Sequence, residues 1–190
     1  RGLAPLVSTD PSCLQNCDLV ILALPLESLL SPQESLIKAI PERAVVTDVG
    51  SVKAEVLAVW RDLHPRFVGS HPMAGTAQAG VDAGLTGLFC GRPWVSTPES
   101  STDASALAVI QQLADRLGSH WLTADAARHD QAVALISHLP VIVSAALLRA
   151  VGEERDPAVL ELARTLASSG FADTSRVGGG NPALGTAMAS

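Results

Sequence analysis

The chain has 190 residues, which fits one large domain or one and a half domains of ordinary size. Hydrophobic residues make up 47% and charged residues only 17%, a composition that excludes an intrinsically disordered chain. The formal net charge of −6 argues against nucleic acid as a partner, because a nucleic-acid surface needs clustered Lys and Arg. We expect no membrane partner either, since no uninterrupted apolar run approaches the ~20 residues of a membrane span.

The three cysteines and the chain ends bear on compartment and completeness. Cys13, Cys17 and Cys90 are odd in number and lack nearby His ligands, so we expect buried free thiols and no metal site. Free thiols are typical of a reducing, cytoplasmic location. The chain lacks an initiator Met and both ends read as interrupted elements, so we interpret it as an internal piece of a longer protein.

Short apolar runs alternate with helical periodicity over the first two thirds of the chain. The pattern predicts strands within 18–25, 43–51, 66–76, 91–98 and 120–124, and helices within 26–40, 52–64 and 103–118. Strict alternation of strand and helix indicates right-handed crossovers and a parallel sheet. We therefore expect an α/β fold with a partial doubly wound (Rossmann-like) sheet, in residues 1–123.

Residues 124–190 have a different pattern, which predicts an all-helical domain. Pro140 lies inside a long helical stretch and should kink it, because proline cannot donate to the carbonyl of Ile136. Asp156 and Pro157 have the residue types of a helix start. A glycine-rich loop then carries Arg176. The boundary between the two domains is predicted near residue 124.

In doubly wound sheets a ligand binds beyond the carboxyl ends of the strands. This rule selects the loops "ALPLE", "TDVGSVK" and "GSHPMAGT", the last of which carries His71. An imidazole at such a place is the usual general base for a hydroxyl proton, and we favour this role over an idle surface histidine. Ser51 has two open readings, an N-cap of the next helix or a side chain in the same crevice.

The helical part supplies further candidates. Arg176, among glycines, fits a bidentate clamp for a carboxylate. His138 and Gln131 share one side of the long helix, and His138 alone reads most simply as a core histidine. His129 and His138 are nine residues apart and point to opposite faces, which excludes a metal site formed by these two side chains.

Four motifs together resemble the prephenate/arogenate dehydrogenase family, and most of all arogenate dehydrogenases of the cyanobacterial type. They are "TDVGSVK", "GSHPMAGT", "HDQAVALISHLP" and "SSGFADTSRVGGGNPALGT", in the right order and spacing over essentially the whole chain. The resemblance implies oxidative decarboxylation of arogenate, or of prephenate, with hydride transfer to a nicotinamide cofactor in tyrosine synthesis. It further implies a nucleotide-binding domain in 1–123 and a helical substrate and dimerisation domain in 124–190.

The resemblance also implies roles for single residues. His71 and Ser51 would be catalytic, and the substrate would contact Arg176, His138, Gln131 and Thr76. The cofactor would lie against Leu24, Pro25, Asp48, Gly50 and Ser51. The cyanobacterial likeness favours NADP, with NAD as the alternative, and the family implies a homodimer.

Two other functions fit this sequence less well. Related β-hydroxyacid and imine dehydrogenases use a catalytic Lys on the helical domain, but no Lys follows Lys53 in this chain. A non-catalytic module that only binds metabolites would have little reason to retain His71, Ser51 and Arg176 together. We therefore expect an enzyme that acts on a small molecule.

Overall fold

The computed structural model describes residues 4–75 and 84–178, which divide into two compact units. Unit 1 contains the described residues up to Asp130, and the described residues of unit 2 begin at Gln131. Helix α5 (Ala126–Val133) carries residues of both units. The domain boundary expected near residue 124 stays a prediction.

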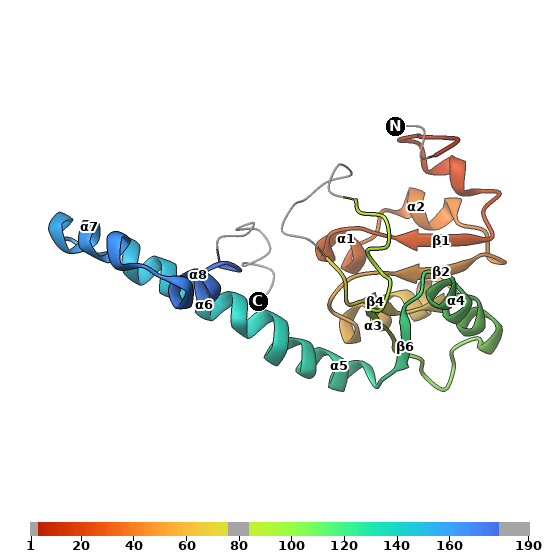
Figure 1. The fold of residues 1–190 in the computed structure, drawn as a ribbon. Helices are drawn as coiled ribbons and strands as arrows, with labels where there is room; N and C mark the ends of the chain where they lie inside the picture. Colours follow the sequence, from red (N-terminus) through yellow and green to blue (C-terminus); the bar gives the residue numbers. More distant parts are fainter. Residues whose placement is uncertain (1–3, 76–83, 179–190) are drawn as a thin grey trace. The chain divides into compact units, whose positions relative to one another are not determined.

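Unit 1 begins with a parallel sheet of three short strands. Their order is β1 (Leu19–Leu22), β2 (Val45–Asp48) and β3 (Phe67–Val68). Figure 1 shows β1 and β2 side by side, in the register that pairs Leu22 with Asp48. The strands therefore end at the same edge, as the sequence predicts for a doubly wound sheet.

Successive residues of the central strand face opposite sides of this sheet and enter two different cores. Val46 packs with Trp60 of helix α3 (Ala54–Leu63), and Val45 packs with Ile110 of helix α4 (Ala104–Arg116). Helices thus cover both faces, which is the layering of a doubly wound α/β domain. Strand β1 is not buried on both faces along its whole length, since Ile21 is 46% exposed.

The segment 26–40 forms two helices where the sequence predicts one. Helix α1 covers Leu26–Leu30 and helix α2 covers Glu34–Ala39. Pro32 lies between them, and a proline disfavours helical geometry in the residue before it. Ser31 accordingly has the non-helical angles φ −132° and ψ 65°. The apolar spacing is that of a helix, but the proline interrupts it.

A second sheet has the order β4 (Ser70–Pro72), β5 (Pro93–Ser96) and β6 (His120–Thr123). Strand β5 pairs in parallel with β6 but antiparallel with β4. The strand predicted within 66–76 is therefore two strands, and the expected all-parallel arrangement is wrong for β4. The fold class is otherwise as predicted, a nucleotide-binding type of α/β domain followed by helices.

Gly69 is the point at which the chain passes from one sheet to the other. A Cβ atom there would lie 2.9 Å from Oγ1 of Thr97 and 3.2 Å from Cγ of Leu57. The Gly69 carbonyl also accepts the Thr97 N–H over 3.0 Å. A glycine is needed here for close packing, and this packing sets where the following strand, with His71, begins.

Residues close in sequence determine where helix α4 begins and ends. The Asp103 carboxylate accepts the N–H of Ala106 and caps helix α4. The chain leaves α4 through Gly118, whose φ of +73° is the left-handed conformation expected for a helix stop. A single 3₁₀ turn, η1 (Pro11–Leu14), precedes β1.

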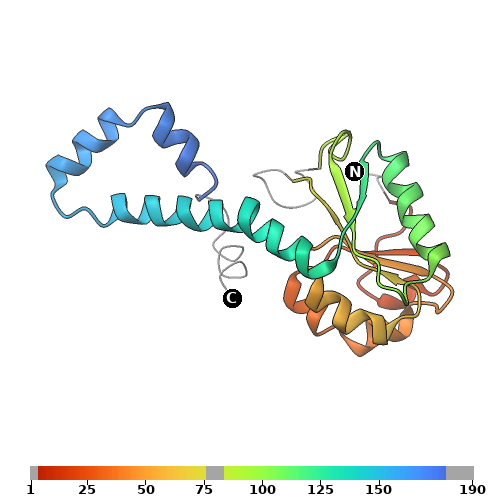
Figure 2. The ribbon, with the colours of Figure 1, turned by 90° about the horizontal axis from the view of Figure 1, so that it is seen from below.

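Every described element of unit 2 is helical, as predicted. Helix α5 continues through a π-helical turn, η3 (Ala134–His138), into α6 (Leu139–Gly152), and α7 (Pro157–Leu166) and α8 (Ser169–Ser175) follow. Figure 2 shows α5 to α6 as one long helical run. Asp156 caps α7 by accepting the N–H of Ala158, as its sequence predicts.

The irregularity expected at Pro140 takes the form of this π-turn. The N–H of Leu139 donates to the carbonyl of Ala134, five residues earlier, instead of to the residue four before it. A wider turn accommodates a proline that cannot donate and whose ring crowds the preceding turn. The same turn contains His138, so the proline also affects the backbone position from which the His138 side chain extends.

The long helical run is more apolar than the sequence analysis expects of any segment of this chain. Residues Ala126–Gly152 form 27 residues of helix with a mean hydropathy of 1.9 over an 18-residue window, so this run is long and apolar enough to cross a membrane. Length and composition alone are weak evidence for a span. Only 11% of that window is buried. Most of the apolar side chains of this run are therefore exposed, and they form a surface that a partner could cover.

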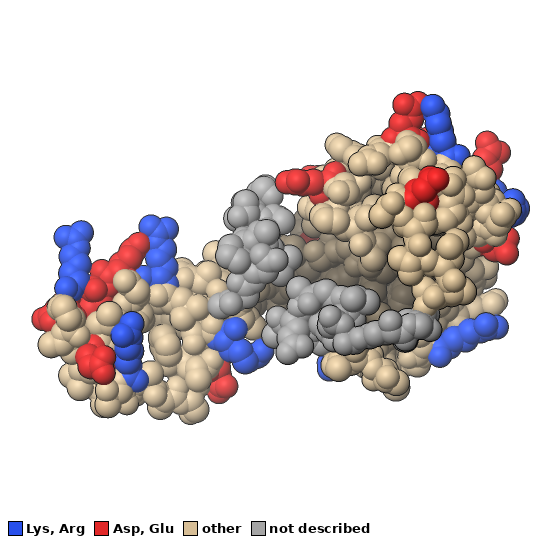
Figure 3. Space-filling model, turned by 90° about the horizontal axis from the view of Figure 1, so that it is seen from above, with Lys and Arg blue, Asp and Glu red and all other residues tan. Residues whose placement is uncertain are grey.

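Charge and cysteine placement complete the description. On the face shown in Figure 3, basic and acidic side chains are interspersed over the helical unit and form no large patch of one sign. The three cysteines are free, as predicted, but the expectation of burial is wrong for Cys13 and Cys90, which are exposed. Cys13 lies on the 3₁₀ turn η1, and Cys90 lies in the turn before β5.

Candidate functional site

The candidate residues of unit 1 follow the carboxyl ends of adjacent strands. Leu24 and Pro25 are exposed just after β1, with Leu24 38% exposed. Gly50 and Ser51 are partly buried after β2. His71 lies within β4 and is partly buried. The register of β1 with β2 brings the first two groups to one edge of the sheet.

A buried ion pair lies directly under this edge. The Lys53 ammonium donates to Oδ2 of Asp48, and both side chains have 0% exposure. Lys53 also donates to the carbonyl of Ser70 over 2.9 Å. Asp48 accepts the Ser70 N–H over 3.2 Å and the Gly50 N–H over 2.9 Å. The pair therefore joins the end of β2, the start of α3 and the start of β4.

Burial dominates the ionisation of this pair. Removal from water raises the pKa of the Asp48 carboxyl, although Lys53 acts in the opposite direction. Burial likewise lowers the pKa of the Lys53 ammonium, against the attraction of Asp48 and, more weakly, of Asp130. Loss of hydration thus exceeds the mutual attraction for both groups. The pair specifies the arrangement of the strand ends more than it stabilises the fold.

Asp48 has no exposed surface, so its carboxylate cannot itself contact a bound molecule. Its expected contribution to a cofactor site is indirect, through the turn that follows it. A Cβ atom at Gly50 would lie 3.1 Å from Oδ2 of Asp48 and 3.2 Å from Cδ1 of Leu29. Glycine at this position lets the turn close over the carboxylate and leaves the next residue, Ser51, partly exposed.

Ser51 is not the N-cap of helix α3, so one of its two sequence readings is wrong. Lys53 occupies that position, and the cap is supplied by Asp130 of helix α5. Oδ1 of Asp130 accepts the Lys53 N–H and Oδ2 accepts the Ala54 N–H, each over 2.8 Å. Since the cap comes from elsewhere in the chain, the Ser51 hydroxyl is not committed to this helix end.

His71 is linked to the same carboxylate through a second histidine. Nδ1 of His71 lies 3.0 Å from Nε2 of His129, and the two rings meet edge to face at 77°. Nδ1 of His129 lies 2.8 Å from Oδ1 of Asp130. His129 is only 5% exposed. All three residues belong to unit 1, and together they form a hydrogen-bonded series from carboxylate to imidazole.

Two of the predicted substrate contacts lie at the start of unit 2. Gln131 is exposed on α5, and His138 is partly buried in the π-turn. Nε2 of His138 is buried and has no hydrogen-bond partner within the described part of the chain. A buried nitrogen of this kind is costly unless a ligand or water satisfies it. Thr76, the remaining predicted contact, lies outside the described residues.

Arg176 is exposed and lies directly after α8, so it follows a short helix where the sequence predicts a loop. Its position is fixed by contacts of its neighbours with α6. The hydroxyl of Ser144 donates to the carbonyl of Thr174 over 2.6 Å and accepts the N–H of Gly178 over 2.8 Å. Ser144 is 1% exposed. The two bonds hold the chain on either side of Arg176 against one helix.

Gly178 makes this close approach possible. A Cβ atom there would lie 2.4 Å from the carbonyl carbon of Ser144 and 2.5 Å from the nitrogen of Ala145. Both neighbours are backbone atoms of α6, which cannot rotate away as a side chain can. The glycine-rich sequence after Arg176 thus has a packing role at its first described position.

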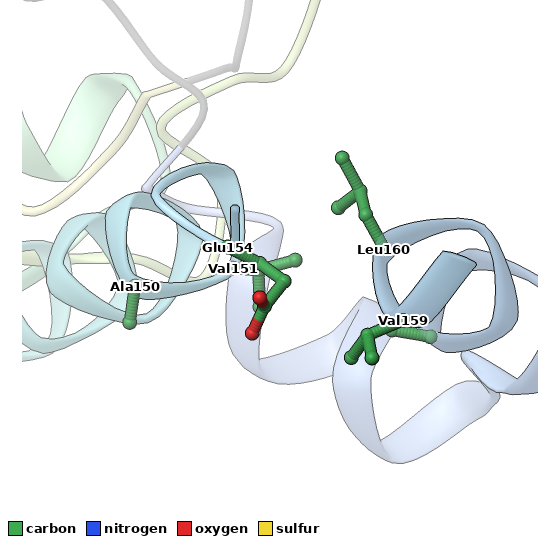
Figure 4. A pocket seen from close by; sticks show the side chains of 6 residues that line it. Ala150, Val151, Glu154, Val159 and Leu160 are labelled. Carbon is green, nitrogen blue, oxygen red and sulfur yellow. The ribbon is translucent and has the colours of Figure 1, made fainter. Parts of the chain in front are cut away.

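A shallow pocket in unit 2 does not coincide with these candidates. Figure 4 shows it between the end of α6 and helix α7. Its lining is mostly apolar: Ala150, Val151, Glu154, Val159, Leu160 and Ala163. None of the predicted site residues contributes to it. The described residues also contain no group of three or more His, Cys, Asp or Glu side chains that could hold a metal ion.

The sequence reasoning did not assign a role to three of the most connected residues, His129, Asp130 and Lys53. Spacing along a helix placed His129 opposite His138, but it gave no partner for it. The available signal was the pair His129 and Asp130 at the start of a helix that follows the last strand. Only the fold brings this pair to His71, 58 residues earlier.

Both parts of the chain are similar to known proteins. The nucleotide-binding domain of prephenate dehydrogenase matches residues 2–123, and the dimerisation domain of prephenate dehydrogenase matches residues 125–190. A curated relative, the cyclohexadienyl dehydrogenase of Zymomonas mobilis, is 32% identical over 90% of this chain and 59% of its own length. The prephenate dehydrogenase of Bacillus subtilis is 32% identical over 87% of this chain and 45% of its own.

Solved structures give the same picture. The arogenate dehydrogenase of Synechocystis is 47% identical, with a TM-score of 0.80, over 96% of this chain and 66% of its own. The prephenate dehydrogenase of Aquifex aeolicus, in complex with hydroxyphenyl propionate and NAD+, has a TM-score of 0.86 at 28% identity, over 95% of this chain and 64% of its own. The chain thus spans about half the length of the curated relatives. It spans about two thirds of the length of these two solved chains.

The buried ion pair gives a first prediction. Replacing Lys53 by Met leaves the Asp48 carboxylate buried and unpaired, and should lower the free energy of unfolding by about 3–5 kcal/mol. The matched control is Lys38→Met, which removes an exposed pair with Glu34 (2.6 Å) and should cost less than about 1 kcal/mol. Urea unfolding measures both. If adding Asp48→Asn to Lys53→Met restores no stability, the cost does not come from the unpaired carboxylate.

The contact at Gly178 gives a second prediction. Gly178→Ala forces its new methyl against the backbone of α6 and should destabilise the helical unit by about 1–3 kcal/mol. Gly170→Ala is the matched control, because a Cβ there meets nothing within 4 Å and alanine favours the helix. Thermal unfolding followed by circular dichroism compares them. Equal melting temperatures for the two variants would contradict the packing role of Gly178.

Proposed function

The chain belongs to the prephenate dehydrogenase family, and from this premise we propose that the protein oxidatively decarboxylates arogenate in tyrosine synthesis. Prephenate is the alternative substrate. The observation that carries the proposal is the linked series of His71, His129 and Asp130 at the strand ends of a nucleotide-binding type of domain. The arogenate preference draws support from the 47% identity to the Synechocystis arogenate dehydrogenase.

In this function His71 accepts the proton of the substrate's ring hydroxyl. The hydroxyl O–H bond breaks as the oxygen becomes a carbonyl-type oxygen, and the imidazole gains the proton. Histidine suits the step because its ordinary pKa lies near neutral pH. Ser51 is proposed to hold the same hydroxyl, which fits a partly exposed serine that does not cap its helix. Loss of carbon dioxide then makes the ring aromatic, so the overall reaction is strongly downhill.

Arg176 is proposed to hold a substrate carboxylate. A guanidinium offers two parallel N–H donors to a carboxylate and keeps its charge throughout the reaction, so it binds without exchanging protons. Its exposed position after α8, fixed through Ser144, supports this role. His138, with an unsatisfied buried nitrogen, and Gln131 and Thr76 are proposed as the other contacts of the substrate.

A nicotinamide cofactor fits the residues at the strand ends. Leu24 and Pro25 present an exposed apolar surface after β1. The turn after β2 packs closely on Asp48 and Leu29 because Gly50 has no side chain. We propose that Leu24, Pro25, Gly50 and Ser51 contact the cofactor, with Asp48 supporting the turn from below. The cofactor supplies the acceptor for the hydride from the ring carbon. NADP is favoured by the likeness to the cyanobacterial enzyme, and the Aquifex aeolicus relative was solved with NAD+.

A homodimer is proposed as the partner of the exposed apolar helices. Residues 125–190 match a domain described as a dimerisation domain. Large apolar side chains on α5 to α7 are exposed by 49–70%: Leu135, Ile136, Leu139, Val143, Leu162 and Leu166. A second copy would remove this area from water, which is a sufficient reason for an apolar helix without a membrane. A cytoplasmic location is part of the same proposal.

The proposed activity is tested with the protein in its full natural length. Formation of reduced nicotinamide is followed by absorbance with arogenate or prephenate, each with NADP or NAD. We expect the fastest turnover with arogenate and NADP. His71→Asn should lower kcat by about 10²- to 10⁴-fold, the usual contribution of a general base. Folded wild-type protein that turns over none of the four pairs would exclude the dehydrogenase function.

The carboxylate clamp has its own test. Arg176→Gln removes a bidentate, charge-assisted contact and should raise KM for the substrate by about 10- to 100-fold, with a smaller effect on kcat. Arg164→Gln, an exposed arginine of helix α7, is the control and should leave both constants unchanged. A KM within twofold of wild type for Arg176→Gln would remove Arg176 from the substrate site.

The dimer is tested by sedimentation velocity of the wild type and of Ile136→Glu. We expect a wild-type mass of two chains and a shift of the variant towards one chain, because a buried carboxylate disfavours an apolar interface. Gln112→Glu, on the exposed side of α4, adds the same charge elsewhere and should remain dimeric. A wild type that stays monomeric at all accessible concentrations would contradict the proposed dimer.

A further inference from the structure

We propose that His129 and Asp130 are positioning residues that hold His71 in the one tautomer able to act as a base at Nε2. This inference rests on the proposed function, because it assigns how the base of that reaction is prepared. It concerns residues that contact His71 and not the substrate. The three side chains are all within unit 1.

The proton positions follow from the chemistry of the three groups. A carboxylate only accepts hydrogen bonds, so the contact of 2.8 Å between Asp130 and His129 requires the proton on Nδ1 of His129. In neutral His129 the other nitrogen, Nε2, is then an acceptor. The contact of 3.0 Å therefore requires Nδ1 of His71 to donate. A neutral His71 with its proton on Nδ1 has its basic lone pair on Nε2.

The series is held rigidly at its carboxylate end. Both oxygens of Asp130 accept backbone N–H groups at the start of α3, from Lys53 and Ala54, each over 2.8 Å. The positive end of the helix attracts this carboxylate and helps to hold it in place. Asp130 therefore fixes both the direction of the proton in the first bond and the place of the ring that makes the second.

The histidine in the middle has little freedom. His129 is 5% exposed, and both of its ring nitrogens are engaged. A flip of the ring by half a turn would put the carbons Cδ2 and Cε1 where Nδ1 and Nε2 now lie, and would break both bonds at once. The backbone of strand β4 is held independently, because Lys53 donates to the carbonyl of Ser70, next to His71. The backbone and the ring of His71 are thus restrained by different residues.

The same arrangement supports the charge that forms during the reaction. When Nε2 of His71 takes the hydroxyl proton, the ring becomes a cation that still donates from Nδ1 to His129. The dipole of His129, anchored on the Asp130 carboxylate, then points its negative end at that cation. Among the residues that the structure describes, Lys53 and Asp48 also lie close to Asp130, as a buried pair of opposite charges. Asp130 is the carboxylate that His129 contacts, and it acts on His71 through that ring.

The test compares two variants of His129 with a matched buried histidine. His129→Leu removes the acceptor for His71 and should lower kcat by about 10- to 100-fold, the usual effect of losing an orienting group, with KM within about threefold of wild type. His129→Gln places an amide oxygen near the position of Nε2 and should recover most of the lost kcat. Asp130→Asn should lower kcat as His129→Leu does, because its amide cannot serve all three donors.

His64→Leu is the control for a loss of buried structure. His64 is also 5% exposed, with one nitrogen 3.1 Å from the carbonyl of Pro41 and the other accepting the Arg66 N–H. It should lower the melting temperature about as much as His129→Leu does but leave kcat unchanged. If kcat falls equally in both variants, or in neither, His129 has only a structural role and the proposal is wrong.

A second measurement separates this inference from the proposed function. Nitrogen-15 spectra of the imidazole rings in the wild type report which nitrogen of His71 carries the proton at neutral pH, without any substrate. We expect Nδ1. A proton on Nε2 would overturn the inference even if the enzyme is active. Conversely, absence of turnover with a proton on Nδ1 would refute the dehydrogenase and leave the positioning series intact.

Discussion

The carboxylate of Asp130 is the constraint on which the candidate site depends. It closes the start of α3 by accepting two backbone N–H groups, and it binds His129, which contacts His71. One side chain of α5 thus caps a helix that begins 76 residues earlier and orients a ring of β4. Because the cap comes from a distant element, the start of α3 and the candidate base His71 are linked through the same carboxylate.

The buried pair of Asp48 and Lys53 performs a related task one layer deeper. Taking both charges out of water costs more than their attraction returns, as the directions of both pKa changes indicate. The pair is therefore better understood through what it joins, which is the turn at Gly50, the start of α3 and the backbone of Ser70. An apolar pair of the same volume would fill the space without fixing these backbone groups.

Unit 2 shows the same reliance on close backbone contact. The buried hydroxyl of Ser144 and the absent side chain of Gly178 hold the segment around Arg176 on α6, while large apolar side chains of the same unit remain exposed. Contacts within unit 2 thus determine the position of Arg176. The exposed apolar side chains also explain why the helical run Ala126–Gly152 has the hydropathy of a membrane span. A dimerisation domain is the family's description of this region.

The sequence by itself determined the alternation of strands and helices, the helical second part and the helix start at Asp156, because each depends on residues close together in the chain. It also selected His71 and Arg176 from their settings. The break of the first helix at Pro32 is local too, since it depends on the effect of the proline on Ser31. The tertiary structure alone decided the change of sheet at Gly69 and the partners of Lys53, His129 and Asp130. These depend on atoms up to 77 residues apart, and periodicity along a chain carries no information about such contacts.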